Sequence, residues 1–397
     1  MTMGEESTRF SAALQEAVAD LEAPNPESLY AGAVSRRRRR VKRHSIGASL
    51  VAIVAAAGVG AMVMNTAGAR HEMTTTTPTT TTASPKPVST QHIAEINTVA
   101  FNPAGTMLAI AGDDGTVRLW NPATQQQIGA IATGSVVDEL AFNPAGTMLA
   151  TAGGDGRVRL WNPTTQKQTG ATITVSSEVV NGVAFNSAGT MLATAEDEGN
   201  DGTVRLWNPA TQQQIGATIT VSTGVGVCRA EFNSAGSMLA TFDGAGKVGL
   251  WNPATQKQIG ATFTANAGSC GAAFDFAGSV LITADNKSSD TKGTVRLWNP
   301  ATQQQIATIA TGSEVYAAAF NPAGTVLATA ENDNTVRLWN PATQQQIATI
   351  PAAQVYVVEF NATDTMLATT SYQGVQLWNP ATHKQIGAIV PTDPEPK

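Results

Sequence analysis

The chain has 397 residues, low charge and many glycines, a composition that favours β-structure with many turns over helical bundles. Residues 91–397 hold 14 Lys and Arg against 23 Asp and Glu, which gives them a net charge of −9. Such an acidic domain argues against DNA or RNA as a partner, because phosphate binding needs a basic face. The whole chain has four His and two Cys, too few for a His/Cys metal cluster, so no metal or cofactor is expected.

Residues 1–45 are expected to form a cytoplasmic tail. Apolar residues recur at helical spacing over residues 8–22, which predicts a short amphipathic helix there; a solvated tail fits the same stretch. An Arg-rich stretch, Arg36 to Arg43, follows. This Arg run and the segment ALQEAVADLEAPNPESL resemble, loosely, the tails of membrane-anchored regulatory proteins of actinobacteria.

Residues 46–64 are predicted to be a transmembrane helix, because these 19 residues carry no charge. At 1.5 Å per residue such a helix spans roughly 28 Å, close to the thickness of a bilayer core. The Arg-rich stretch before it should stay cytoplasmic, which places the following residues outside the cell membrane. Two alternatives remain: signal-peptide cleavage after Ala69, which would release a secreted protein, and a buried helix of a soluble protein.

Residues 65–90 are expected to be an extended linker. Thr and Pro dominate the stretch EMTTTTPTTTTASPKPVST, which has too little apolar surface to pack a core. Beyond a membrane it would serve as a stalk.

Residues 91–390 repeat themselves seven times, and residues 391–397 are a short tail. Each repeat contains the segment LWNP, and the spacings between successive tryptophans are 41, 46, 44, 47, 41 and 39 residues. A period in the low forties is typical of β-propellers. The tryptophans of these segments are Trp120, Trp161, Trp207, Trp251, Trp298, Trp339 and Trp378.

Each repeat predicts four short strands. In the second repeat these are residues 136–143, 147–152, 157–162 and 167–173, bounded by turns rich in Gly, Pro, Asn and Asp. The fold class is therefore all-β, a seven-bladed propeller of four-stranded antiparallel blades. Each Trp should fill the space between neighbouring blades.

The segment FNPAGTMLATAGGDGRVRLWNP resembles the WD40 repeat family, and the likeness covers residues 91 to about 390. It departs from the family in having Trp-Asn instead of Trp-Asp and in lacking the Gly-His pair, so the family's His-Asp-Ser/Thr-Trp hydrogen-bond network is not expected in full. The acidic residues that remain in the second turn should serve as turn formers: Asp114, Asp155, Asp201 and Asp333. The last repeat supplies its own fourth strand (383–390), which predicts ring closure by face packing between blades 1 and 7.

One end of the repeats varies while the other end barely changes. The residues four positions before each repeated Phe should ring the mouth of the central channel at the variable end: Asn97, Asp138, Asn181, Cys228, Cys270, Tyr316 and Tyr356. In WD40 proteins this face commonly binds partners, and the two tyrosines suit that role. Sequence drift in tolerant loops is the alternative explanation.

Cys228 and Cys270 are the only cysteines and occupy the same position in adjacent repeats. They could form a disulfide outside the cytoplasm, or serve as two small apolar residues in a tight ring. The acidic segment EDEGNDG (196–202) could attract Ca²⁺, but it lacks the regular ligand spacing, and a solvated loop is the favoured interpretation.

The sequence therefore favours a membrane-anchored, monomeric scaffold without enzymatic activity, whose propeller lies outside the cytoplasm. Its partner would be a protein or peptide bound through Asn97, Asp138, Asn181, Tyr316 and Tyr356. One alternative is a transmembrane sensor whose tail, residues 1–45, passes on a signal. Another is a propeller hydrolase using Glu95, Asp138 and Glu314, which carry no recognisable catalytic motif.

Overall fold

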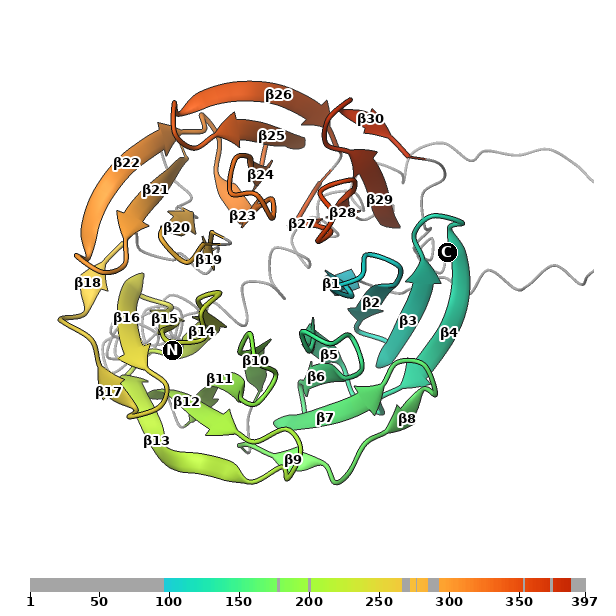
Figure 1. Ribbon diagram of the computed structural model, residues 1–397, viewed down its shortest axis with the longest axis vertical. Helices are drawn as coiled ribbons and strands as arrows, with labels where there is room; N and C mark the ends of the chain where they lie inside the picture. Colours follow the sequence, from blue (N-terminus) through green and yellow to red (C-terminus); the bar gives the residue numbers. More distant parts are fainter. Residues whose placement is uncertain are drawn as a thin grey trace, which may run out of the picture.

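The computed structural model describes a ring of seven antiparallel sheets around a central axis (Figure 1). The described residues are 96–176, 179–198, 201–265, 272–275, 277–284, 293–352, 354–371 and 374–386. The predicted tail, transmembrane segment and linker (1–45, 46–64 and 65–90) and the C-terminal residues 391–397 lie outside them. Within the described ranges, no helix has the length and apolar character needed to cross a membrane.

The first four blades follow one another in the sequence. Blade 1 is β1 (Ile96–Phe101), β2 (Leu108–Gly112), β3 (Thr116–Asn121) and β4 (Gln126–Ala132). Blade 2 is β5 (Val137–Phe142), β6 (Leu149–Gly153), β7 (Arg157–Asn162), β8 (Lys167–Gln168) and β9 (Ile173–Thr174). Blade 3 is β10 (Val180–Phe185), β11 (Leu192–Glu198), β12 (Asp201–Trp207) and β13 (Gln214–Ser222). Blade 4 is β14 (Val227–Phe232), β15 (Leu239–Asp243), β16 (Lys247–Asn252), β17 (Lys257–Gln258) and β18 (Phe263–Thr264).

The remaining three blades complete the ring. Blade 5 is β19 (Ala272–Phe274), β20 (Leu281–Ala284), β21 (Thr294–Asn299) and β22 (Gln304–Ala310). Blade 6 is β23 (Val315–Phe320), β24 (Leu327–Glu331), β25 (Thr335–Asn340) and β26 (Gln345–Pro351). Blade 7 is β27 (Val357–Phe360), β28 (Leu367–Ser371), β29 (Gly374–Asn379) and β30 (Lys384–Gln385). The prediction of four-stranded blades is confirmed, except that the outer strand of blades 2 and 4 is split in two.

Two repeated turns explain why the sequence is so uniform at one end of the blades. After the inner strand, the Asn102 side-chain oxygen accepts hydrogen bonds from the backbone N–H groups of Thr106 and Met107. After the third strand, the Asn121 side chain accepts from the N–H groups of Ala123 and Thr124. The Asn of LWNP is therefore an Asx-turn residue that directs the chain into the outer strand.

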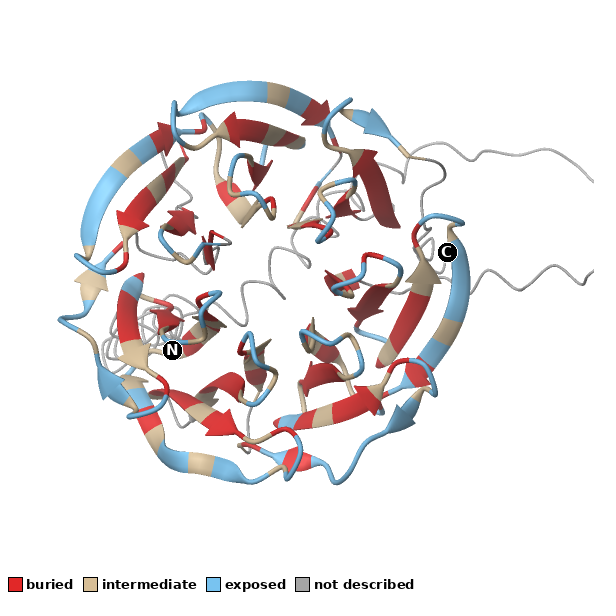
Figure 2. Cartoon of the chain, viewed as in Figure 1, coloured by how far each residue is buried: buried red, intermediate tan, exposed pale blue. Residues whose placement is uncertain are grey.

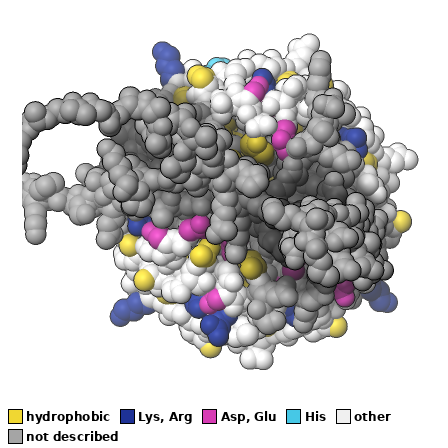
Figure 3. Space-filling model, turned by 180° about the vertical axis from the view of Figure 1, so that it is seen from behind, with side chains coloured by type: hydrophobic (Ala, Val, Ile, Leu, Met, Phe, Trp, Pro, Cys, Tyr) yellow, Lys and Arg dark blue, Asp and Glu magenta, His cyan; other side chains and the backbone are white. Residues whose placement is uncertain are grey.

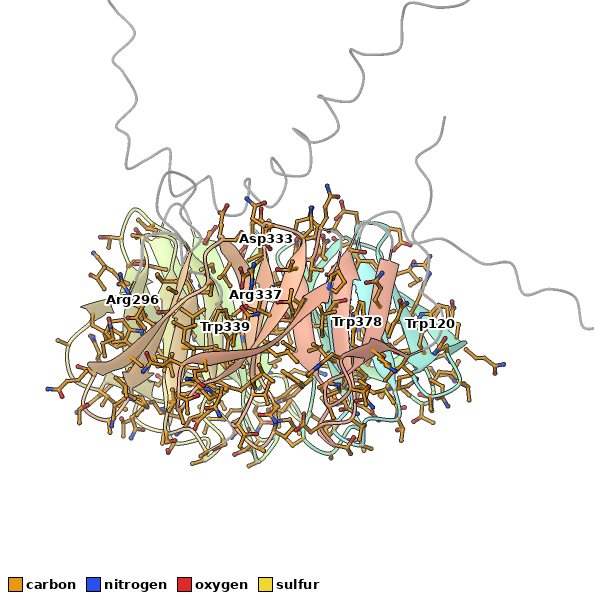
Figure 4. The ribbon with its side chains drawn as sticks, turned by 90° about the horizontal axis from the view of Figure 1, so that it is seen from above. Trp120, Arg296, Asp333, Arg337, Trp339 and Trp378 are labelled. Carbon is orange, nitrogen blue, oxygen red and sulfur yellow. The ribbon has the colours of Figure 1, made fainter. Side chains whose placement is uncertain are left out.

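The tryptophans pack between blades, as the sequence predicts. Trp161 of blade 2, for example, belongs to the same apolar cluster as Val117, Leu119 and Ile131 of blade 1. The second strand of each blade is buried, the inner strands mix buried and half-buried residues, and the outer strands are mostly exposed (Figure 2). Trp339 and Trp378 lie halfway along the height of the ring, and Asp333 lies at its variable end (Figure 4).

A shortened hydrogen-bond network survives around six of the tryptophans. The Trp161 indole N–H donates to the Thr151 hydroxyl over 3.0 Å, and the tryptophans of blades 3 to 7 make the same bond. Blade 1 has Ile110 in place of the Thr, and among the described residues the buried Trp120 N–H has no hydrogen-bond partner. The expected loss of the full family network is thus partial, because the Trp–Thr bond remains.

The acidic residues of the second turn do more than form the turn. Asp114, Asp155 and Asp333 each accept from an Arg on the third strand: Arg118 at 2.6 Å, Arg159 at 2.8 Å and Arg337 at 2.5 Å. The turn-former prediction was therefore incomplete for these three. The fourth, Asp201, accepts from the backbone N–H of Gly224 over 3.0 Å.

The ring closes by packing of blade 7 on blade 1. One apolar cluster joins Phe101, Leu108 and Ile110 of blade 1 to Val375 and Leu377 of blade 7. Two hydrogen bonds cross the same junction. The Phe101 N–H donates to the Glu359 carboxylate over 3.1 Å, and the Gln125 side chain donates to the Ile386 carbonyl over 3.0 Å.

A glutamine from each of several blades also fastens the outer strand of the preceding blade, an arrangement we call the glutamine clasp. The Gln212 side chain accepts from the Ala171 N–H over 2.6 Å and donates to the Thr169 carbonyl over 2.8 Å. Gln256 and Gln303 repeat the pair, and Gln166 makes the first of the two bonds. The glutamine packs against a glycine of the strand, Gly129, Gly170, Gly216 or Gly260, where an added Cβ would come within 2.0–2.5 Å of it.

Blades 5 and 6 carry Ala307 and Ala348 at the position of that glycine. The methyl group occupies the space of the clasp, and the Gln344 side chain, although it stands in the same turn as Gln303, makes no hydrogen bond among the described residues. The clasp is therefore absent between blades 5 and 6.

We expect Gln212→Ala to lower the free energy of unfolding by about 1–2 kcal/mol, because two hydrogen bonds to backbone groups are lost. Gln344→Ala should change it by less than about 0.5 kcal/mol, because no such bonds exist there. Both positions share a positive φ, near 60°, so backbone effects cancel in the comparison. Denaturant unfolding of both variants checks this, and equal losses would refute the clasp.

Candidate functional site

The channel-mouth residues, defined as Asn97, Asp138, Asn181, Cys228, Tyr316 and Tyr356, occupy one structural position. In the first four blades and in blade 6, the pairing of the first two strands shifts register around this residue, as at a β-bulge. Tyr356 directly precedes β27, and Cys270 lies outside the described residues. A bulge redirects a side chain out of the regular sheet alternation. All six residues are partly exposed.

Two asparagines of this set connect their blade to the next one. The Asn97 amide donates to the Val137 carbonyl of blade 2 over 3.1 Å and to Asp113 over 2.8 Å. The Asn181 amide donates to the Val227 carbonyl of blade 4 over 3.0 Å and to Asp197 over 3.1 Å. The position therefore has a structural role that the sequence did not reveal, namely joining neighbouring blades at the channel mouth.

The tyrosines of blades 6 and 7 form a pair at the same position. The ring centroids of Tyr316 and Tyr356 are 5.7 Å apart with an interplanar angle of 39°. The Tyr316 hydroxyl also bonds to the Asn332 side-chain oxygen over 2.5 Å. Two aromatic rings thus lie side by side at the variable end, in a tilted geometry favourable for aromatic pairs.

The Cys228 sulfur lies 3.3 Å from the Phe242 carbonyl oxygen. The only other cysteine of the chain, Cys270, lies outside the described residues. The disulfide expected between Cys228 and Cys270 therefore remains a prediction.

The carboxylates of the acidic segment 196–202 are the candidate Ca²⁺ ligands in the sequence. Glu196 pairs with Arg205 over 2.6 Å, and Asp197 accepts from Asn181, so these carboxylates already have protein partners. Within the described part of the chain, no cluster of His, Cys, Asp and Glu could hold a metal ion.

A charged cluster lines the central channel, and sequence reasoning missed it. The Arg229 Nε atom lies 3.3 Å from the Glu231 carboxylate, and Glu231 also accepts from the Phe274 N–H of blade 5 over 3.2 Å. Glu359 makes the equivalent bond to Phe101, and the Thr98 hydroxyl donates to Glu139 over 3.3 Å. A usable signal existed, because the residue before each repeated Phe is Ala in five repeats and Glu in the repeats of Glu231 and Glu359.

The channel shifts the pKa values of this cluster. Burial raises the pKa of Glu359 to about 8, since the Phe101 N–H and Arg229 only partly offset burial and the charge of Glu139. Burial likewise raises the pKa of Glu231, against the opposing effect of Arg229. Burial lowers the pKa of Arg229, but the carboxylates of Glu231, Glu139 and Glu359 outweigh it, so that this pKa is raised.

The ion pair between Arg229 and Glu231 keeps part of its surface in contact with water. The side chains of Arg229 and Glu231 are 41% and 23% accessible to solvent, so both groups still face water in the channel. Water in the channel weakens the interactions between these charges.

Two of the three residues expected to serve a hydrolase, Asp138 and Glu314, are described, and they stand in different blades. Asp138 lies in the bulge of blade 2, and Glu314 lies beside the Asn332 side chain at 3.4 Å. Glu95 lies outside the described residues.

These features define a class, the seven-bladed β-propellers, with seven sequence-contiguous sheets around one channel. The family model described as "WD domain, G-beta repeat" matches residues 85–121, 127–162, 167–208 and 303–340. The chain thus contains WD40 repeats within a seven-bladed propeller, and WD40 propellers are generally non-enzymatic scaffolds that bind other proteins. No curated protein matches the chain in a sequence search.

Proposed function

We propose that the protein is a membrane-anchored scaffold whose propeller binds a protein or peptide at the channel mouth, outside the cytoplasm. The observation that carries the proposal is the chemical variety of the channel-mouth residues. They are Asn, Asp, Cys or Tyr at one bulged position, whereas the turns at the opposite end are nearly identical in every repeat.

The structural links at this position do not remove its capacity to bind. If joining blades were the only role of this position, an Asn such as Asn97 or Asn181 would serve in every blade. Blades 6 and 7 instead carry a pair of tyrosines there. Tyrosine offers apolar area and a hydroxyl together and is enriched in binding hot spots. Acidic side chains lie on this face and several Lys and Arg side chains project from its rim (Figure 3), which favours a partner with basic groups.

The anchored topology rests on the uncharged segment 46–64 behind an Arg-rich stretch. Proteolysis on intact cells tests it. Cleavage of the propeller without permeabilisation is the expected result, and protection until the membrane is opened would contradict the proposal.

We expect the double variant Tyr316→Ala, Tyr356→Ala to bind its partner at least about tenfold more weakly, because hot-spot residues typically contribute about 2 kcal/mol or more. Partners would be captured from membranes by crosslinking with the wild-type protein and then titrated against each variant. The variant Tyr316→Phe, Tyr356→Phe keeps the ring pair and serves as the matched control. Unchanged affinity of the Ala variant, with its unfolding midpoint preserved, would remove the tyrosines from the site.

A further inference from the structure

A cavity opens between blades 5 and 6, at the end of the ring opposite the channel mouth. Its volume is about 260 Å³, just under the ~300 Å³ where pockets for drug-sized ligands begin. Its walls include Val280, Leu297, Phe320 and Ile306, and Ile306 is 55% exposed. The cavity therefore has room for one large apolar side chain. Figure 1 shows β22 and β26 as the neighbouring outer strands at this junction.

Two departures from the repeat meet at this cavity. Ala307 replaces the clasp glycine, so Gln344 is not fastened to the edge of β22. At the previous junction, between blades 4 and 5, Gln303 bonds to the backbone of Ile259 and Ala261. By their position in the repeat, the Ile306 carbonyl and the Thr308 N–H of β22 correspond to these two groups, and Ile306 and Gln344 both line the cavity. An extended peptide could bond to these groups in place of the clasp.

Asp275 is the second departure. Its position is Asn in the other six repeats, from Asn102 to Asn361. The Asp275 carboxylate accepts from the Ser279 hydroxyl and from two backbone N–H groups, and no cation pairs with it among the described residues. Among the described residues that line the cavity, Asp275 alone has a charged side chain, and its negative charge is complementary to a basic group.

We propose that this cavity, the blade 5–6 notch, binds an extended peptide segment that inserts one large apolar side chain next to a Lys or Arg. The apolar side chain fills the notch, the neighbouring basic group faces Asp275, and the peptide backbone bonds to the edge of β22 and to Gln344. This site is separate from the channel mouth, so that either site can fail without affecting the other.

The test uses the full-length protein and the probe N-acetyl-4-fluorophenylalanyl-lysine amide, followed by fluorine NMR titration. Ala342→Trp should weaken binding at least about tenfold, because the new ring blocks the notch at an exposed turn position. Ala301→Trp alters the same position in blade 5, where the clasp is intact, and should leave binding unchanged. No saturable binding of the probe to the wild-type protein, or equal binding to both Trp variants, would overturn the proposal.

Two further variants identify the contacts. Asp275→Asn restores the residue that the other repeats use, so the fold should hold, and it should erase a severalfold preference for the Lys probe over its Glu analogue. Ala307→Gly should allow the Gln344 clasp to form and reduce binding, whereas Ala348→Gly at the next junction should not. An unchanged Lys preference in Asp275→Asn would exclude the assigned charge contact. The variant Tyr316→Ala, Tyr356→Ala should bind the probe normally, which separates this site from the channel mouth.

Discussion

Thr151→Val should lower the free energy of unfolding by about 1–3 kcal/mol, because it leaves the buried Trp161 N–H without an acceptor. Thr151 is 2% exposed and Trp161 is 7% exposed, so water does not replace the lost bond. The two side chains have nearly the same shape, which confines the change to the hydroxyl. Denaturant unfolding followed by tryptophan fluorescence measures the loss.

Blade 1 provides the matched control, because Ile110 stands at the position of Thr151 and the described part of the chain offers the Trp120 N–H no acceptor. There Ile110→Thr should be more stable than Ile110→Val, although a buried hydroxyl ordinarily makes Thr the worse of the two. If Val were preferred over Thr at both positions, the Trp–Thr bond would not contribute to stability.

Glu359→Gln should remove much of the pH dependence of stability between pH 4.5 and 8. Glu359 has a folded-state pKa of about 8 against an ordinary value of 4.5. In this window the folded protein keeps a proton that the unfolded chain releases, so the free energy of unfolding falls as the pH rises. The effect of this one group is on the order of 3 kcal/mol after allowance for channel water.

The surroundings of Glu359 make this a specific test. Glu139 from β5, Arg229 and Glu231 from β14 and the Phe101 N–H from β1 all act on it or on its neighbours. Glutamine can still accept the bond from Phe101, so the junction between blades 7 and 1 keeps its contact. A steep fall in stability that persists in Glu359→Gln would assign the effect elsewhere.

The repeats predicted the architecture well because each structural task recurs. LWNP provided the blade number, the tryptophan packing and the turn into the outer strand. The closure of blade 7 on blade 1 was also predicted, since the last repeat carries its own outer strand, and the seam packs as expected.

The contacts between blades were harder to predict, because they depend on residues that are distant in the sequence. The glutamine clasp joins residues about 40 positions apart. Only the structure shows that Gly129 leaves room for the clasp, whereas the methyl group of Ala307 fills that space. The bond from Phe101 to Glu359 spans almost the whole propeller sequence. The channel-mouth position was found from its variability, but its role in joining blades depends on a bulge that the pattern of apolar residues does not reveal.

Site-specific photocrosslinking tests the central claim, that the variable end is the binding face, most directly. A photoreactive side chain would replace Asn97 or Tyr316 at the channel mouth, or Thr124 or Thr165 in the turns at the opposite end, one position at a time. The account predicts that one and the same partner is captured from both channel-mouth positions and from neither turn. Capture of that partner only from the turns, or equally from all four positions, would contradict it.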